Sequence, residues 1–201
     1  GTILKNKAIG NQVYWLIFTN ISQHDKHGKN AIISRQQEID TTAKAYNFDG
    51  FFTLDFPATK LDTLPKRQRI ERVNEVIGNI KPEVVYIPNR SDVHSDHRVA
   101  FDVMISATKT FRYPCIKKIL MYEVVSETEF APSMPDNAFV PNSFSDITNY
   151  MDKKLAIMKI YKNELKRFPF PRSIENIKAL ATFRGATAAV KYAEAFMVLK
   201  E

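Results

Sequence analysis

Short apolar runs alternate with longer amphipathic stretches along this sequence. The run Val13–Phe18 is continuously apolar, as in a strand that is buried on both faces. Further strands are expected at Phe51–Leu54, Glu83–Ile87 and Ile116–Val125. Strands that are separated by helical stretches indicate β/α crossovers and a mainly parallel sheet. We therefore expect one α/β domain over residues 1–201.

The amphipathic stretches predict the helices. In the clearest of them, Ile70, Val73 and Ile77 recur at spacings of three and four, which defines an apolar stripe on one helix face. Ser34, followed by a glutamine three positions later, resembles a capping box and predicts a helix start. The expected helices cover residues 1–8, Ser34–Tyr46, Lys66–Ile80, Val99–Thr110, Thr148–Arg167 and Arg184–Val198.

The cysteine content and the apolar runs bear on the compartment. A single cysteine, Cys115, excludes an intrachain disulfide and favours a reducing environment. No apolar run approaches the roughly 20 residues that a membrane span needs. The run Val13–Phe18 lacks the small-residue cleavage site of a signal peptide. We therefore expect a cytoplasmic protein without a membrane span.

The formal net charge of +7 raises the question of an anionic partner. Lys and Arg are spread along the chain and often stand beside acids, as between Lys66 and Glu75, which is typical of a solvated helix face. This pattern argues against a nucleic-acid partner. An anionic small-molecule substrate would suit the charge, and so would a non-catalytic basic module that binds an anionic ligand or a protein partner.

The segment from Asn89 to Arg98 carries the residues best suited to chemistry. It contains Asp92, His94, Asp96 and His97 and follows the strand Glu83–Ile87 directly. Ligands of open parallel sheets bind beyond the carboxyl ends of the strands, so an active site belongs here. Imidazole and carboxylate groups are the usual ligands of catalytic zinc. Alternatively, Asp92 or Asp96 caps the helix that follows.

This loop by itself does not complete a zinc site, because catalytic zinc takes about three protein ligands. Several other segments in the chain, taken in order, resemble one known family. They are Gly1–Ile3, Arg35–Glu38, Leu54–Thr59, Val84–Pro88 with Asp92–Ala100, Asp146–Thr148 with Asp152–Lys154, and Arg184–Gly185 with Tyr192–Phe196. Together they resemble the LmbE-like/PIG-L family of zinc-dependent N-acetylglucosaminyl deacetylases over essentially the whole chain.

The resemblance implies a Rossmann-like three-layer sandwich and a divalent metal, usually Zn²⁺. Carried over by position, it implies that His97 is a metal ligand and that His94 stabilises the oxyanion or protonates the leaving amine. Asp96 would orient His94, and Arg35 would help to bind substrate. The implied substrate is an N-acetylglucosamine-type amino sugar, free or linked to a nucleotide, a lipid or a thiol precursor. The resemblance leaves open whether the protein is a homo-oligomer.

The family's first signature, Ala-His-Pro-Asp-Asp-Glu, supplies two further metal ligands and the general base. It stands just before the segment that Gly1–Ile3 resembles and does not occur in the 201 residues. We therefore expect the first strand to be missing and the 201-residue chain to bind zinc poorly and hydrolyse little. The chain would be either a fragment of a longer protein or a truncated gene product.

Four other residues carry weaker expectations. His24 and His27 share a His-x-x-His spacing, but they stand in a polar loop that is expected to form a rim of the site. Arg35 has an alternative as a surface residue that pairs with Glu38 or Asp40. Glu194 is expected to serve in helix packing or capping rather than in catalysis.

Overall fold

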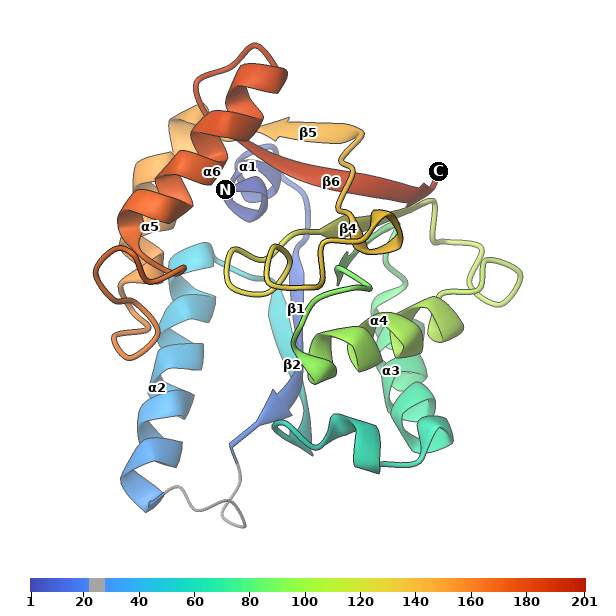
Figure 1. The fold of residues 1–201 in the computed structure, drawn as a ribbon. Helices are drawn as coiled ribbons and strands as arrows, with labels where there is room; N and C mark the ends of the chain where they lie inside the picture. The colour runs from blue at the N-terminus through green and yellow to red at the C-terminus, as the bar shows by residue number, and fades with distance from the viewer. Residues whose placement is uncertain (22–27) are drawn as a thin grey trace. The chain divides into compact units, whose positions relative to one another are not determined.

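The computed structural model describes residues 1–21 and 28–201, and its helices alternate with short strands (Figure 1). The helices are α1 (Thr2–Ala8), α2 (Lys29–Tyr46), α3 (Lys66–Ile80), α4 (Ser95–Ala107), α5 (Met151–Met158) and α6 (Ile174–Thr187). The strands are β1 (Tyr14–Asn20), β2 (Gly50–Pro57), β3 (Val84–Pro88), β4 (Lys118–Tyr122), β5 (Ser143–Asp146) and β6 (Ala193–Lys200). His24 and His27 lie outside the described residues.

The chain divides into two compact units. Unit 1 comprises Gly1–Asp55 and Phe144–Glu194, and unit 2 comprises Phe56–Ser143 and Ala195–Glu201. The chain therefore passes from one unit to the other within β2, within β5 and within β6. The expectation of a single domain over residues 1–201 stays a prediction.

Unit 2 contains the β/α crossover that the sequence predicts. Strands β3 and β4 pair in parallel, with Val85 opposite Ile119 and Ile87 opposite Met121. These four side chains are buried, as the period-two alternation of a strand requires on its covered face. Helix α4 connects the two strands and packs against β3 and α3 (Figure 1). As a result, the segments that follow β3 and β4 meet at one edge of the sheet.

Helix α3 has the bounds that its apolar stripe predicts. Val73 and Ile77 are buried, while the polar face of the helix is exposed. The helix ends at Lys81, whose left-handed backbone (φ 51°) closes the last turn, and Pro82 then prevents further helix.

In unit 1, the short helix α1 begins where Gly1 passes very close to another segment. A Cβ atom at Gly1 would lie 2.6 Å from the side chain of Ile147, so no larger residue fits there without a shift. The backbone N–H of Thr2 donates to the carboxylate of Glu194, at 2.7 Å. The predicted capping role of Glu194 therefore agrees with the structure, although Glu194 lies on strand β6 and not on a helix.

Three predicted helices differ from the structure by five residues or more at one end. The expected helix Arg184–Val198 is wrong in its second half, because the chain leaves α6 at Thr187 and returns as strand β6, antiparallel to β4. Phe196 pairs there with Tyr122 and contacts the ring of Tyr86, at 5.3 Å between ring centroids. This tertiary pairing outweighs the helix propensity of the alanines.

The other two corrections concern helix ends. The helix expected at Thr148–Arg167 ends at Met158, beyond which the chain forms tight turns around Glu164. Helix α2 begins at Lys29, so Ser34 lies inside it and does not cap it.

The four-stranded sheet has the order β3-β4-β6-β5, and β1 and β2 form a separate two-stranded sheet. No helix within the described residues combines the length and the apolar character that crossing a bilayer requires.

Candidate functional site

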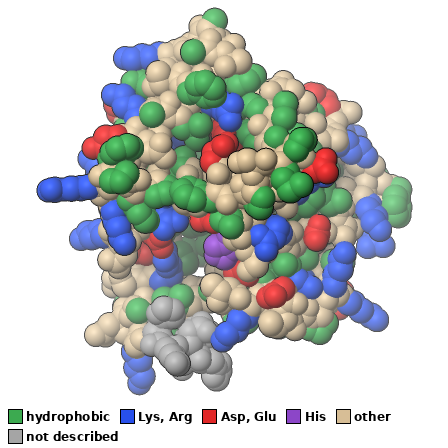
Figure 2. Space-filling model, viewed as in Figure 1, with side chains coloured by type: hydrophobic (Ala, Val, Ile, Leu, Met, Phe, Trp, Pro, Cys, Tyr) green, Lys and Arg blue, Asp and Glu red, His purple; other side chains and the backbone are tan. Residues whose placement is uncertain are grey.

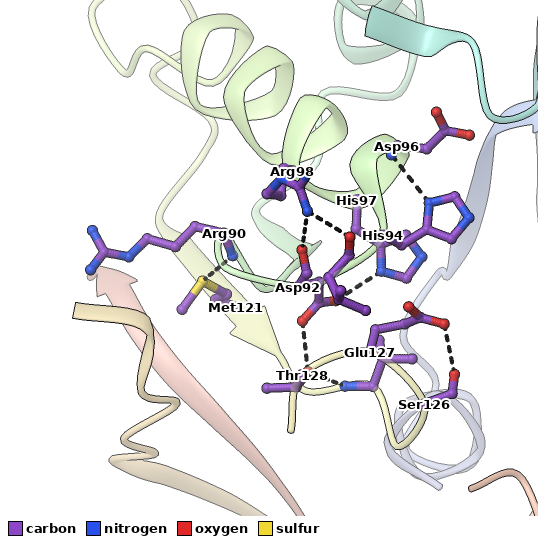
Figure 3. A network of polar contacts seen from close by, with 12 residues as sticks. Arg90, Asp92, His94, Asp96, His97, Arg98, Met121, Ser126, Glu127 and Thr128 are labelled. Atoms are coloured by element: carbon purple, nitrogen blue, oxygen red, sulfur yellow. Dashed lines mark hydrogen bonds and ion pairs between the residues drawn. The ribbon is translucent and has the colours of Figure 1, made fainter. Parts of the chain in front are cut away.

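The loop between β3 and α4 places two imidazole rings on the first turn of α4. His94 is the N-cap of the helix, and its Nδ1 accepts the backbone N–H of Asp96, at 3.2 Å. His97 lies one turn further along, and the two rings stack with 5.1 Å between centroids (Figure 3). Because Nδ1 of His94 accepts a hydrogen bond, the neutral ring carries its proton on Nε2.

His97 is held by a buried carboxylate. Its Nδ1 lies 2.8 Å from Oδ2 of Asp92, whose side chain is 0% exposed, whereas the His97 side chain is 31% exposed. The other oxygen of Asp92, Oδ1, accepts the hydroxyl of Thr128 at 2.7 Å. Within the part of the chain that the structure describes, neither histidine has a hydrogen-bond partner at Nε2. Both Nε2 atoms are therefore available to a ligand.

The segment that follows β4 supports this loop from below. The backbone N–H of Val93 donates to the carbonyl of Glu127, at 3.2 Å, and Thr128 belongs to the same segment (Figure 3). Tyr122 ends β4 beside this network, where burial and the charge of Asp92 raise the pKa of its phenol to about 12. Tyr122 therefore stays protonated at neutral pH.

Arg98 stabilises the loop between β3 and α4 through hydrogen bonds to its backbone. One guanidinium nitrogen donates to the carbonyl oxygens of Asp92 and Val93, at 2.7 and 2.6 Å. No role was predicted for Arg98 or for Thr128 from the sequence. The position of Thr128 just beyond a strand parallel to β3 was the signal that could have linked it to Asp92, since carboxyl ends of neighbouring parallel strands share one edge.

Asp96 differs from its expected role. Its side chain is buried, and its two carboxylate oxygens accept the backbone N–H groups of Thr59 and Leu61, at 2.7 and 3.2 Å. The carboxylate points away from His94 (Figure 3), so the ring is oriented by the backbone N–H of Asp96 and not by its side chain. The reason is that the segment Ala58–Leu61 leaves backbone donors that a carboxylate satisfies.

Arg35 lies in unit 1, on helix α2, and its guanidinium already has two partners. One nitrogen pairs with Glu38 at 3.2 Å, and another pairs with Glu164 at 3.0 Å. The guanidinium also lies over the ring of Tyr161, at 5.6 Å. The alternative was a surface arginine that pairs with Glu38 or Asp40, and of these the structure shows the pair with Glu38. A substrate role for Arg35 stays a prediction.

The chemistry of the donors fits a metal at one position. A histidine that donates its Nδ1–H to a carboxylate presents the lone pair of Nε2, which is the usual arrangement of a metal-binding imidazole. His97 with Asp92 has this form. Within the described residues, no group of three or more His, Cys, Asp or Glu side chains is placed to hold a metal ion. The described residues therefore offer one imidazole suited to metal binding and not a complete set of ligands.

Solved structures of known proteins show the same fold. A conserved protein from Thermus thermophilus is 22% identical, with a TM-score of 0.76 over 98% of this chain and 86% of that one. The N,N'-diacetylchitobiose deacetylase of Pyrococcus horikoshii is 19% identical, with a TM-score of 0.75 over 99% of this chain and 77% of the other. The 4-carboxy-2-hydroxymuconate hydratase of Pseudomonas putida is 17% identical, with a TM-score of 0.71 over 100% of this chain and 89% of that one.

At these identities the likeness establishes the fold alone, and it confirms the predicted Rossmann-like α/β class. The family is established by sequence. The model of the PIG-L family, described as GlcNAc-PI de-N-acetylase, matches residues 1–108 of the 201, which is more than half of the chain and includes the His94–His97 turn. The chain therefore belongs to the PIG-L family of de-N-acetylases.

Proposed function

We propose that this protein is a metal-dependent hydrolase that removes the N-acetyl group from an N-acetylglucosamine-type amino sugar or its conjugate. The observation that carries the proposal is the pair of imidazoles on one turn, one with a free Nε2 lone pair and the other with a proton on Nε2. Metal-assisted amide hydrolysis uses both a metal ligand and a hydrogen-bond donor for the oxygen that gains charge. Family membership supports the same reaction.

In this proposal His97 would hold the metal, zinc or another divalent ion, through Nε2. A bound zinc ion would lower the pKa of a water molecule to about 7 and polarise the acetyl carbonyl. His94 would either donate its Nε2–H to the carbonyl oxygen as negative charge develops there or, when it is protonated on both nitrogens, give a proton to the leaving amine. The helix N-terminus at His94 adds a positive partial charge beside the developing oxyanion. Asp96 holds the backbone that orients His94.

The compartment and the substrate belong to the same proposal. A single cysteine, Cys115, suits a reducing cytoplasm. The sugar is a small molecule, free or linked to a nucleotide, a lipid or a thiol precursor. Because one protein of the same fold is a hydratase, the fold does not by itself dictate amide hydrolysis. The assay must therefore measure the released amine directly.

The test compares the 201-residue chain with the product of its complete reading frame, since the resemblance assigns the base and two ligands to a signature that the 201 residues lack. Each is incubated with a panel of N-acetylglucosamine conjugates, with zinc and with a chelator, and the free amine is measured. We expect the complete product to release amine from at least one conjugate and to stop when the metal is removed. Amine release that persists in chelator would contradict the metal dependence.

Two substitutions separate the roles of the histidines. His97→Gln should abolish both stoichiometric zinc binding and turnover. His94→Gln should retain zinc and lower kcat by about 10²–10³-fold, the usual effect of losing one oxyanion donor. Asp102→Asn, on the exposed side of α4, serves as the matched control and should behave as the unaltered protein. Equal zinc binding by His97→Gln and the control would remove His97 from the metal site.

The net charge of +7 favours one alternative, a non-catalytic module that binds an anionic ligand or a partner protein. On the face drawn in Figure 2, Lys and Arg side chains occur at several separate places and acidic side chains lie among them. This distribution argues against the alternative. Absence of turnover by the complete product, together with salt-dependent binding to an anionic polymer, would favour it.

A further inference from the structure

Asp92 joins the two loops that follow the parallel strands β3 and β4. Its backbone belongs to the first loop, and its carboxylate accepts the hydroxyl of Thr128 in the second loop, at 2.7 Å. The hydroxyl oxygen of Thr128 in turn accepts the backbone N–H of Val124, at 2.8 Å. Asp92 is fully buried and Thr128 is buried as well, so solvent does not compete for these bonds.

The donors and acceptors of this chain have one consistent direction. The N–H of Val124 can only donate, and an ionised carboxylate can only accept, so Thr128 accepts from Val124 and donates to Oδ1 of Asp92. Oδ2 of Asp92 must then accept from Nδ1 of His97. The guanidinium of Arg98 donates to the backbone carbonyls of Asp92 and Val93 and so holds the loop that carries this carboxylate. His97 is thereby left with an unprotonated Nε2.

The neighbouring His94 has the opposite arrangement. Its Nδ1 accepts a backbone N–H, so its proton lies on Nε2. The two rings are stacked on one helical turn, but their Nε2 atoms differ. Nε2 of His97 presents a lone pair, and Nε2 of His94 presents an N–H donor. The difference is set by their Nδ1 partners, and only His97 has a side-chain partner.

We propose that Asp92, supported by Thr128, is a positioning residue that fixes His97 as the Nδ1–H tautomer and so makes its Nε2 a metal ligand. The metal-binding part of this inference rests on the proposed function. The tautomer is a property of the metal-free chain and can be measured without it. Neither residue touches the reacting atoms, so both act through the ring of His97.

The test is nuclear magnetic resonance of the imidazole nitrogens in metal-free protein at about pH 8.5, where a histidine of ordinary pKa near 6.5 is neutral. The chain has four histidines, and the signal of His97 is identified by its loss in His97→Gln. We expect His97 to be the Nδ1–H tautomer and His94 the Nε2–H tautomer. In Asp92→Asn, the amide can donate to Nδ1, so His97 should shift toward the Nε2–H tautomer. An unshifted His97 in this variant would overturn the proposal.

A second pair of variants guards against a folding defect in Asp92→Asn. Thr128→Val removes the hydroxyl that orients the carboxylate and should leave His97 in mixed tautomers. Thr128→Ser keeps the hydroxyl and should restore the unaltered spectrum, which a loss of packing alone would not explain. Asp102→Asn is the control for loss of a carboxylate on the same helix. Thermal unfolding of each variant shows whether the fold is intact.

Zinc titration of the complete product then connects the tautomer to the metal. Asp92→Asn should weaken zinc binding by about 10–100-fold, the usual effect of losing a carboxylate behind a metal-binding histidine. If the tautomers behave as expected but the unaltered protein neither binds zinc nor turns over substrate, the proposed function fails and the positioning role of Asp92 stands. If zinc binds and turnover occurs but neither depends on Asp92, the positioning role fails and the function stands.

Discussion

Asp96 stabilises a strained turn by accepting two backbone hydrogen bonds. Thr59, which donates one of them at 2.7 Å, has a left-handed backbone with φ 60°, a conformation that costs a β-branched residue about 1–3 kcal/mol. The second bond, from Leu61, is buried. A carboxylate here serves the structure of the site by fixing both the turn and the backbone that orients His94.

Asp96→Asn should therefore lower the free energy of unfolding by about 1–3 kcal/mol, because the amide group would face a backbone N–H that it cannot accept. Chemical denaturation of the variant and of Asp102→Asn measures the difference. The exposed Asp102 has no such bonds to lose, so its variant should unfold with the unaltered protein. Equal stability of the two variants would show that the Thr59 turn does not depend on this carboxylate.

The residues of the site were predictable to different degrees. His94 and His97 follow a strand at the spacing of one helical turn, so the sequence predicts that they lie together, as they do. The partner of His97 was not predictable, because Asp92 and Asp96 are both close in sequence and only the fold directs one carboxylate inward to the ring. Thr128 lies 36 positions from Asp92, so only the parallel pairing of β3 with β4, and not the spacing in sequence, could have connected them.

At the scale of elements, two helical glycines have different surroundings. Gly78 lies on the exposed side of α3, where an added Cβ would contact nothing within 4 Å. Gly185 lies in the last turn of α6, where a Cβ would meet the carbonyl oxygens of Val190 and Lys191, at 2.7 and 2.8 Å. The chain must pass this close to α6 in order to reverse direction into β6.

The same substitution should therefore have opposite effects at the two positions. Gly78→Ala should stabilise the protein by about 0.5–1 kcal/mol, because alanine loses less backbone entropy in a helix. Gly185→Ala should destabilise it by about 1–3 kcal/mol, because the obstructing atoms are backbone and cannot turn aside. Thermal unfolding of both variants checks the signs. A stable Gly185→Ala would mean that the reversal after α6 is looser than the structure shows.

These elements also show where periodicity predicts structure. Helix α3 was predicted at its observed bounds because a stripe of spacing three and four covers it from end to end. The segment after Arg184 was not, because its alanines favour a helix while the burial of Ala195 and Phe196 against β4 decides for a strand. The local hydrophobic pattern predicts an element correctly where one face of that element is buried. It fails where pairing with a strand distant in sequence supplies the stabilising free energy.

At the scale of the whole molecule, three carboxylates of unit 1 bear on acid stability. Burial raises the pKa of Glu194, but the charge of Lys154 and hydrogen bonds from Lys154 and Thr2 hold this pKa well below its ordinary value. Hydrogen bonds lower the pKa of Asp49, from Lys7 first, and that of Asp146, from Thr148.

A carboxyl group whose pKa is lower in the folded state than in the unfolded state releases protons on folding. Its contribution to stability is fully present above its ordinary pKa of about 4 and is lost as the pH falls through the folded value. These three carboxyl groups should therefore leave the midpoint of thermal unfolding nearly constant between about pH 7 and pH 5. In more acidic solution they should make the midpoint fall steadily. A midpoint that holds to about pH 3 would contradict this expectation.

Glu194→Gln tests whether Glu194 contributes most of these three carboxylates to the acid dependence of stability. Glu194 is 23% exposed, whereas Asp49 and Asp146 lie at the surface, where salt screens their interactions. The variant should lose the ion pair with Lys154, made at 2.7 Å, and with it about 1–3 kcal/mol at neutral pH. Because glutamine does not titrate, its unfolding midpoint should also fall less steeply below about pH 4.5 than that of the unaltered protein. In Glu194→Gln, the remaining fall of the unfolding midpoint in acid should arise from exposed groups, so raising the salt concentration should reduce it. If the midpoint of Glu194→Gln instead falls with pH as steeply as that of the unaltered protein, the acid sensitivity belongs to groups other than Glu194.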